Sequence, residues 1–424
     1  MELLSNWFGT TEPTMVIAAL LAVVFGSYMA WTIGANDVAN AMATSVGSST
    51  LTYRQAIVIA GIMEFAGAVL AGSHVTDTIR KGIINAQLFE SDPHLLMYGM
   101  LSALLAAAIW LHVATLLGLP VSTTHSIVGA VVGFGILIYG LNAIHWVKIV
   151  QIVLSWVISP VAGGIVAYLL FKLIRKKIFA AQDTRKALIN WAPLFAGLTL
   201  SIIVLAVIYK GLKNLNLNLP PNKAFLVAAA IGIITYILFS VILRHKKETS
   251  FQNIKSIESV FKILGMITAA YLAFAHGAND VANAIGPVAA VIATVGEGVV
   301  ALKVGVPLWI LYMGGIGIVL GLATQGYKVM RTVGSDITKL TPSRGFTAAF
   351  SAASVVVICS RLGLPVSTTH TLVGAVLGVG IAQGIDSIDL RVVRSIVNSW
   401  LLTLPVAAAL SIIIFLILKL IFHL

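Results

Sequence analysis

The sequence predicts an all-α polytopic membrane protein built from two repeats of inverted topology. Three observations support this fold class: a very apolar composition with long uninterrupted apolar runs, two motifs that each occur twice, and two strongly basic loops on either side of the chain centre. Together they indicate helices that cross a bilayer, a duplicated unit, and a second copy that starts on the side where the first copy ends.

The membrane assignment rests on composition. Hydrophobic residues make up 59% and charged residues 10% of the 424 residues, which is too little charge to cover a water-soluble surface. Apolar runs long enough to cross a bilayer core lie at 15–33, 101–119 and 224–243. They lack the polar–apolar alternation of membrane-barrel strands. The net charge of +12 is typical of basic cytoplasmic loops, and no basic face with interleaved aromatics indicates nucleic-acid binding.

An internal duplication divides the chain. The stretch "GANDVANA" occurs at 34–41 and again at 277–284, and "GLPVSTTH" occurs at 118–125 and 363–370. A two-fold repeat of this length is typical of secondary transporters rather than of solenoids. We therefore expect a first repeat at 1–175, a second repeat at 255–424, and between them a spacer at 176–254 with two further membrane helices.

The distribution of positive charge predicts the orientation of the two repeats. The two most basic segments are 172–187 and 244–262, and the positive-inside rule places both in the cytoplasm. The first repeat then ends inside and the second begins inside. Because the N-terminus is acidic and the C-terminal tail carries only Lys419, we expect both termini outside the cytoplasm, an odd number of crossings in each repeat, and an inverted relationship between them.

The first repeated motif places polar residues inside an apolar segment. Asn36 and Asn40 are one helical turn apart with Asp37 beside them, and Gly34 would allow an unwound backbone. A charged Asp at the bilayer centre costs about 2.5–3.5 kcal/mol on insertion scales, so a partner is expected, and no Lys or Arg lies within ten residues. Carboxylate and amide oxygens suit a small hard cation such as Na⁺, and Asp37 itself could take a proton. The alternative is a cluster that caps a broken helix or bonds to a neighbouring helix.

The second repeated motif predicts an anion site. Pro120 and Pro365 suit the first turn of a helix, and the hydroxyl residues that follow would lie in that turn: Ser122, Thr123 and Thr124 in one copy, and Ser367, Thr368 and Thr369 in the other. Free backbone N–H groups, hydroxyls and the positive end of a helix bind anions. The preceding glycines indicate a re-entrant helical hairpin that reaches the midplane. Ordinary bonding of Ser and Thr to the helix backbone is the alternative.

A two-fold axis in the membrane plane, which relates the inverted repeats, would bring both motifs to one midplane site. Helix N-termini and hydroxyls would hold an anion there, and the acids would hold cations beside it. No fixed Arg is needed, so affinity could depend on a cation gradient, as alternating access by a symporter requires.

The paired motifs resemble those of the inorganic phosphate transporter (PiT) family of sodium- or proton-coupled carriers, and the resemblance covers nearly all of both repeats. It implies about 12 membrane segments in a plasma (inner) membrane, no cofactor, and symport of phosphate with Na⁺, which we favour over H⁺. It assigns phosphate to Ser122, Thr123, Thr124, Ser367, Thr368 and Thr369. It assigns the cations or the phosphate edge to Asn36, Asp37, Asn40, Asn279, Asp280 and Asn283, with sodium at Asp37, Asn40, Asp280 and Asn283.

Other residues have weaker claims. Glu64 lies in an apolar run opposite Ile318 of the other repeat, and it is either a further cation or access-path residue or a structural acid. His125 and His370 either carry protons or orient the hydroxyl loop. His276 precedes only the second "GAND", where the first has Ile33, which argues against an essential role.

The rival functions are an anion channel and a carrier of sulfate or another oxyanion. No nucleophile with a paired base, metal-ligand cluster or nucleotide loop indicates an enzyme or a primary pump. The stoichiometry, the choice between Na⁺ and H⁺, and a homo-oligomeric state stay open.

Overall fold

The fold is an all-helical bundle in which the two repeats interlock. The structure is a computed structural model that describes residues 12–71, 83–208, 219–245, 254–297, 306–361 and 366–423. Eleven helices of the described residues are long and apolar enough to cross a membrane. Helix α15, with 16 residues, completes the pattern of about 12 segments that the sequence predicts.

The elements of the first repeat follow one another in the order of the motifs. They are α2 (Pro13–Ile33), η1 (Gly34–Val38), α3 (Ala39–Gly47), α4 (Tyr53–Ala71), η3 (Ala86–Phe89), α6 (Pro93–Leu116), α7 (Thr123–Tyr139), η4 (Gly140–Ala143), α8 (Trp146–Ile174) and η5 (Arg175–Phe179). The spacer forms α9 (Thr184–Ala206) and α10 (Pro221–His245).

The second repeat repeats this order. Its elements are α11 (Ile254–Glu297), α12 (Leu308–Gln325), α13 (Tyr327–Arg331), η9 (Thr332–Asp336), α14 (Pro342–Arg361), α15 (Thr368–Gln383), η10 (Ile385–Ser387) and α16 (Leu390–Phe422). The described parts of α11 therefore correspond to α2, η1 and α3 together, and the hairpin α14–α15 corresponds to α6–α7.

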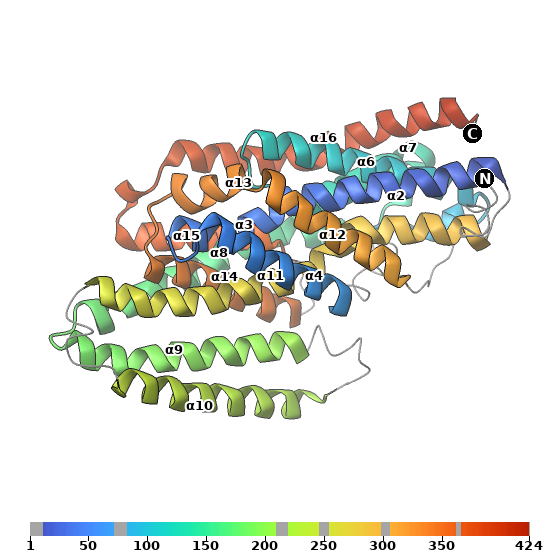
Figure 1. The fold of residues 1–424 in the computed structure, drawn as a ribbon. Helices are drawn as coiled ribbons and strands as arrows, with labels where there is room; N and C mark the ends of the chain where they lie inside the picture. The colour runs from blue at the N-terminus through green and yellow to red at the C-terminus, as the bar shows by residue number, and fades with distance from the viewer. Residues whose placement is uncertain are drawn as a thin grey trace.

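The two repeats run in opposite directions through the bundle. The start of α2 and the end of α16 lie at the same end, which is the right-hand end of Figure 1, and the rings of Tyr98 and Phe422 are 4.9 Å apart there. At the opposite end, one apolar cluster joins the end of α8 to the starts of α9, α11 and α14 through Ile174, Leu188, Phe261 and Phe346. The first repeat thus ends where the second begins, as the charge pattern predicts.

Close backbone contacts show the pseudo-two-fold relationship residue by residue. A Cβ added to Gly34 would lie 1.8 Å from the carbonyl oxygen of Ile318, and one added to Gly277 would lie 2.2 Å from the carbonyl oxygen of Glu64. These are equivalent contacts, since Gly277 is the counterpart of Gly34 and Ile318 that of Glu64. Only a residue without a Cβ allows the helices to approach so closely.

The hairpins also cross between repeats. Helix α7 packs on α16, and α15 packs on α8. The same kind of contact occurs twice, because Gly129 lies against the backbone of Leu404 and Gly374 lies against the backbone of Pro160. Each hairpin is therefore held by the last helix of the other repeat, so the tips of both hairpins meet inside the bundle.

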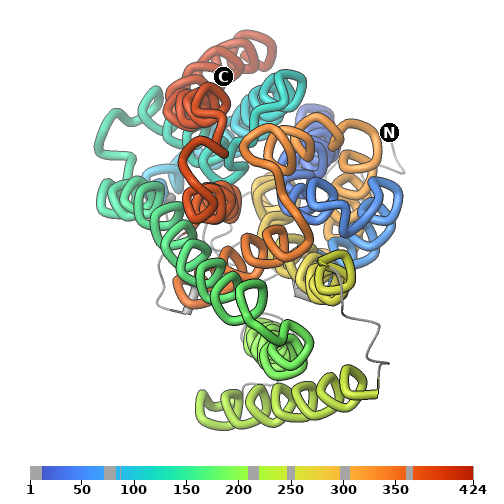
Figure 2. Tube along the Cα trace, turned by 90° about the vertical axis from the view of Figure 1, so that its left-hand side faces the viewer, coloured from blue at the N-terminus to red at the C-terminus, as the bar shows by residue number. Residues whose placement is uncertain are grey.

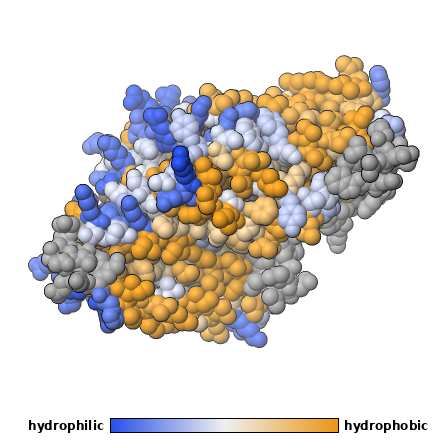
Figure 3. Space-filling model, viewed as in Figure 1, coloured by the Kyte–Doolittle hydropathy of each residue, from blue (hydrophilic) through white to orange (hydrophobic). Residues whose placement is uncertain are grey.

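The outer surface fits a lipid environment. Large apolar side chains are exposed along α8, α10 and α16, for example Val157, Leu226 and Leu401 at 65–66%. The α9–α10 pair lies outside the main bundle (Figure 2), and apolar residues cover it in Figure 3. Among the described helices α10 packs chiefly on α9, where Gly197 and Gly232 allow the two backbones to approach.

Two local expectations are wrong. Helix α7 begins at Thr123 with Ser122 as its N-cap, so Pro120 lies in the extended segment before the helix and not in its first turn. Gly34 does not begin an unwound stretch, because the chain stays helical through a π turn at Gly34–Val38. A π turn keeps the backbone hydrogen-bonded while it turns side chains to new directions. Pro365 and Gly363 of the second hairpin lie outside the described residues.

Candidate functional site

The Asp37 carboxylate joins the two hairpins. Its Oδ2 accepts a hydrogen bond of 2.5 Å from the hydroxyl of Thr123, in the first turn of α7. Its Oδ1 accepts one from the hydroxyl of Thr369, in the first turn of α15. The backbone N–H of Thr123 also points to Oδ2, at 3.4 Å. The structure therefore brings residues of both sequence motifs and of both repeats to one place.

Both hairpins present the same local geometry. The side chain of Ser122 accepts the backbone N–H of His125 at 3.4 Å, and that of Ser367 accepts the N–H of His370 at 3.3 Å. Each serine is thus an N-cap that starts its helix. The first turns of α7 and α15 point their N-terminal ends into the bundle, as an anion site requires.

Asn36 holds the loop of the first hairpin. Its Nδ2 donates to the hydroxyl of Thr115 and to the carbonyl of Leu119, both at 3.0 Å, and its Oδ1 accepts the N–H of Val121 at 3.0 Å. The π turn separates Asn36 from Asn40, which faces a cavity on the side of α11 and α14. The two asparagines were expected on one face, and they contact different elements.

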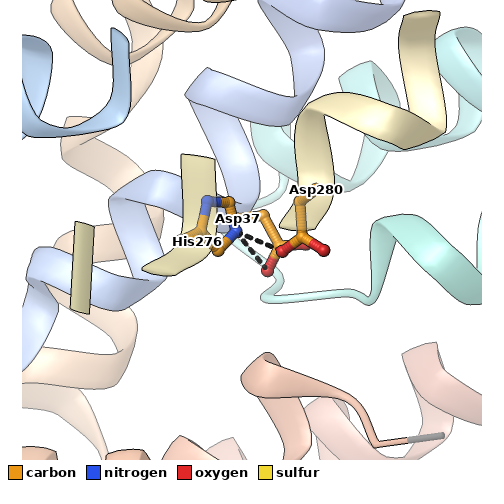
Figure 4. A group of neighbouring side chains, drawn as sticks. All are labelled: Asp37, His276 and Asp280. Atoms are coloured by element: carbon orange, nitrogen blue, oxygen red, sulfur yellow. Dashed lines mark ion pairs between the residues drawn. The ribbon is translucent and has the colours of Figure 1, made fainter. Parts of the chain in front are cut away.

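A histidine lies among three carboxylates beside Asp37. His276 Nε2 is 2.7 Å from Oδ2 of Asp280 and 3.8 Å from Oδ1 of Asp37, as Figure 4 shows. Its Nδ1 is 3.1 Å from Oε1 of Glu64. Because an ionised carboxylate only accepts hydrogen bonds, these contacts of both ring nitrogens fit an imidazolium with two N–H donors.

The buried charges do not balance among themselves. Asp37, Glu64, His276 and Asp280 are each at most 3% exposed. Three carboxyl groups face one imidazole, so the acids of this cluster outnumber its basic side chain by two. Buried charge is costly unless it is paired, so the cluster is suited to take up cations.

The remaining residues of the two motifs lie around this cluster. Asn279 Nδ2 donates to Oδ1 of Asp280 at 3.0 Å, and Asn283 Nδ2 donates to the hydroxyl of Thr124 at 3.3 Å. Thr368 lines the cavity together with Asp37, Asn40, His276 and Asn279. Every residue that the sequence proposes for phosphate or cations is therefore near the hairpin tips or the Asp37 cluster.

The cavity at the cluster is small. Its volume of about 20 Å³ is enough for one water molecule, and a phosphate ion does not fit. Asn40 Oδ1 is a buried atom without a hydrogen-bond partner among the described residues. An unpartnered oxygen beside a carboxylate is a fitting ligand for a hard cation.

A transition-metal site fits less well. Asp37, His276 and Asp280 each offer one ligand atom, and these atoms lie within 4.8 Å of one another. However, His276 Nε2 is 2.7 Å from a carboxylate oxygen, which is the distance of an ion pair between an imidazolium and a carboxylate. A nitrogen that donates a proton cannot also ligate a metal.

The histidines of the hairpins form a separate ring cluster. The rings of His125 and His370 are 4.7 Å apart, and His370 stacks on Trp400 at 3.7 Å. Trp400 donates from Nε1 to the carbonyl of Pro120 at 2.9 Å. The rings thus pack the two hairpins against each other and against the final helix.

Sequence reasoning gave no role to His276, which the structure places in the middle of the acids. The signal that could have found it is its spacing, because a His four residues before an Asp on a helix faces it. Glu64 could be singled out from sequence, but its partner could not.

Comparison with known proteins agrees with this arrangement. Residues 33–411 match the model of the phosphate transporter family. The chain belongs to that family. Its members are transporters, not enzymes, and the match includes both copies of both motifs.

Relatives and a solved structure extend over nearly the whole transporter. A Pyrococcus abyssi protein, provisionally named a phosphate permease, is 49% identical over 93% of this chain and 96% of its own length. The chloroplastic inorganic phosphate transporter 2-1 of Arabidopsis thaliana is 44% identical over 92% of this chain and 70% of its own. A solved sodium-dependent phosphate transporter has a TM-score of 0.86 and 46% identity, covering 96% of this chain and 100% of that one.

Proposed function

We propose that the chain imports inorganic phosphate by symport with Na⁺. Phosphate would lie between the first turns of α7 and α15, held by backbone N–H groups and by hydroxyls of the two threonine-rich motifs. Na⁺ would lie beside it, on oxygens of the two Asp–Asn motifs. The observation that carries this proposal is the Asp37 carboxylate, which contacts Thr123 and Thr369 at both helix starts and so joins the anion elements to the acids.

Charge supports a coupled mechanism. The cluster has an excess of buried negative charge, so an anion alone would be repelled from it. Cations on Asp37, Asn40, Asp280 and Asn283 would offset that charge and make phosphate binding favourable. The affinity for phosphate then depends on the cation concentration, which is the linkage that a symporter uses.

A hard cation such as sodium fits the available ligands better than a soft transition-metal ion. The donors at Asp37 and Asn40 are carboxylate, amide and hydroxyl oxygens, which hard cations prefer. The name of the solved relative describes a sodium-dependent transporter. We therefore favour Na⁺ over H⁺ as the coupling ion.

The closed cavity supports alternating access. With room for about one water, the site must open before a phosphate enters. The two hairpins belong to inverted repeats and reach the site from opposite ends of the bundle, so opening one or the other would expose the site to either side at the midplane. A continuous channel would instead need an open polar path.

Transport by purified protein in liposomes tests the proposal. An inward Na⁺ gradient should drive uptake of radioactive phosphate above equilibrium, an H⁺ gradient without Na⁺ should not, and excess sulfate should not compete. Uptake driven by H⁺ alone would contradict sodium coupling. Competition by sulfate would favour a general oxyanion carrier, and flux that neither saturates nor follows the gradient would favour a channel.

A further inference from the structure

The two copies of "GANDVANA" have identical letters and different surroundings. Equivalence of Gly34 with Gly277, and of Ile318 with Glu64, follows from their matching backbone contacts. The residue before each motif copy is Ile33 in the first and His276 in the second. The Glu64–His276 pair of one side therefore corresponds to an apolar Ile318–Ile33 pair on the other.

All four of these side chains are buried, at 0% exposed for Glu64, Ile33 and Ile318 and 2% for His276. The same place in the packing thus accepts either a charged pair or two isoleucines. Since an apolar pair is accommodated there and a buried charged pair is costly, the charged pair is not needed to fill space. Its contribution is to the electrostatics of Asp280.

The charged pair acts on one aspartate more than on the other. His276 Nε2 lies 2.7 Å from Asp280 and 3.8 Å from Asp37, so only the first distance is short enough for a charge-assisted contact. A ring nitrogen therefore lies against Oδ2 of Asp280, while Oδ1 accepts the side chain of Asn279. A cation at Asp280 would have to share that oxygen with the imidazole ring, which weakens its binding there.

Asp37 has neighbours of a different kind. Its two carboxylate oxygens accept hydroxyls of Thr123 and Thr369, and hydroxyl oxygens keep lone pairs that can ligate a cation. Asn40 lies one turn after Asp37, and Thr44 lies one turn after Asn40 on α3. Asn40 Oδ1 and Thr44 Oγ1 are both buried and lack a hydrogen-bond partner among the described residues.

The second copy lacks the counterpart of this hydroxyl. Pro287 stands where the first copy has Thr44. The first copy therefore offers a carboxylate, an amide and a hydroxyl oxygen in a row. The second copy lacks the hydroxyl and has the imidazole ring of His276 beside its carboxylate. Hard cations bind oxygen ligands.

We propose that the Glu64–His276 pair makes the two motif copies unequal, so that the tighter cation position is the one formed by Asp37, Asn40 and Thr44. Glu64 is a positioning residue in this arrangement. It holds Nδ1 of His276 at 3.1 Å and so directs Nε2 at Asp280. The inference rests on the proposed cation coupling and deepens it by assigning the tighter cation to one copy.

Sodium binding to the purified full-length protein without phosphate tests the inequality. Asp37→Asn should weaken binding of radioactive sodium by about tenfold or more, as loss of a ligand does. Asp280→Asn should weaken sodium binding at the tighter position by less than about threefold. Both variants should still lose coupled phosphate uptake. Equal weakening, or a larger effect of Asp280→Asn, would overturn the proposal.

The charged pair should be the cause of the difference. In the double variant Glu64→Ile/His276→Ile, both copies have the same apolar neighbours, and only the difference between Thr44 and Pro287 remains. The gap between the effects of the two aspartate substitutions on sodium binding should therefore become smaller than in the wild type. If the gap is as wide in that background as in the wild type, the pair does not create the inequality. Thr44→Val should weaken the tight step by about tenfold, and sodium binding that is unchanged in Thr44→Val contradicts the assigned ligand set.

A variant that keeps the volume of the side chain guards against loss of folding. Glu64→Gln removes only the charge that anchors His276, so the effect of Asp280→Asn should increase at least about threefold in its background. A different result would contradict the proposed function. If the wild type takes up phosphate without sodium, both the proposed symport and the inequality of the cation positions are wrong. If uptake is driven by sodium but Asp37→Asn and Asp280→Asn weaken sodium binding equally, only the inequality is contradicted.

Discussion

The hydroxyl of Thr369 donates a hydrogen bond to Oδ1 of Asp37, across 332 positions of sequence and between the two repeats. Helix α15 and the π turn of the first repeat therefore meet at a single carboxylate. An inverted repeat makes this contact possible, because the hairpin of one half enters the bundle beside the acidic motif of the other.

Removal of that hydroxyl should impair transport. Thr369→Val keeps the shape of the side chain and leaves Asp37 without one donor, so sodium-driven phosphate uptake should fall by about tenfold or more. The matched control is Thr371→Val on the same helix. Its hydroxyl donates only to the backbone carbonyl of Ser367, at 2.7 Å. Uptake by Thr371→Val should stay within about twofold. Equal losses in the two variants would point to helix packing instead of a role at the site.

Asn36 should matter for stability as well as for transport. Asn36→Ala removes three hydrogen bonds that hold the loop between α6 and α7, which should cost about 1–3 kcal/mol because buried partners are left unpaired. The melting temperature in detergent should drop accordingly. The control Asn222→Ala lies at the exposed start of α10 and should change the free energy of unfolding by less than about 0.5 kcal/mol. An unshifted melting temperature in Asn36→Ala would mean that the loop is held by other contacts.

Close helix packing at the motif should tolerate no added methyl group. The Cβ of Gly277→Ala would lie 2.2 Å from the carbonyl oxygen of Glu64, which is backbone and cannot move aside. Overpacking of this kind costs about 1–3 kcal/mol, and separation of α4 from α11 would also misplace His276. In the control Gly61→Ala the nearest atom is a side-chain carbon of Val319 at 3.2 Å, which can shift. Folded yield and melting temperature compare the two, and a variant Gly277→Ala as stable as Gly61→Ala would contradict the observed helix spacing.

The direction of the chain through the membrane can be measured with single cysteines. After replacement of Cys359 by Ala, an impermeant maleimide added to intact cells should label Thr14→Cys and His423→Cys but not Asp183→Cys. Thr14 belongs to the start of α2 and His423 caps the end of α16, and these lie at one end of the bundle. Asp183 is the N-cap of α9, which starts at the opposite end (Figure 1). Labelling of Asp183→Cys alone would reverse the proposed orientation, and labelling of only one terminus would contradict the inverted repeat.

Much of the fold followed from sequence because its determinants are repeated or extreme. Long apolar runs predict helices in lipid, and duplicated motifs predict two halves. The hydroxyl residues that follow Gly-Leu-Pro predicted the helix starts at Thr123 and Thr368. Pro120, however, lies before the helix and not in it. The π turn at Gly34–Val38 could not be predicted, since the identical letters at 277–281 form part of a continuous α-helix.

The gathering of the two motifs at one place was predictable from the sequence, but the individual contacts were not. Both motifs do converge at the hairpin tips. Asn36 holds a loop and Asp280 pairs with His276, because these contacts depend on which helices are neighbours. The Glu64–His276 pair joins positions 212 residues apart, and only the packing of α4 on α11 brings them together.

A structure of the protein with phosphate and sodium bound tests the central claim most directly. The account predicts one phosphate between the first turns of α7 and α15, within hydrogen-bond distance of threonine hydroxyls of both hairpins, with a cation against the carboxylate of Asp37. Phosphate bound at a single hairpin or away from Asp37, with no cation beside that carboxylate, would contradict it.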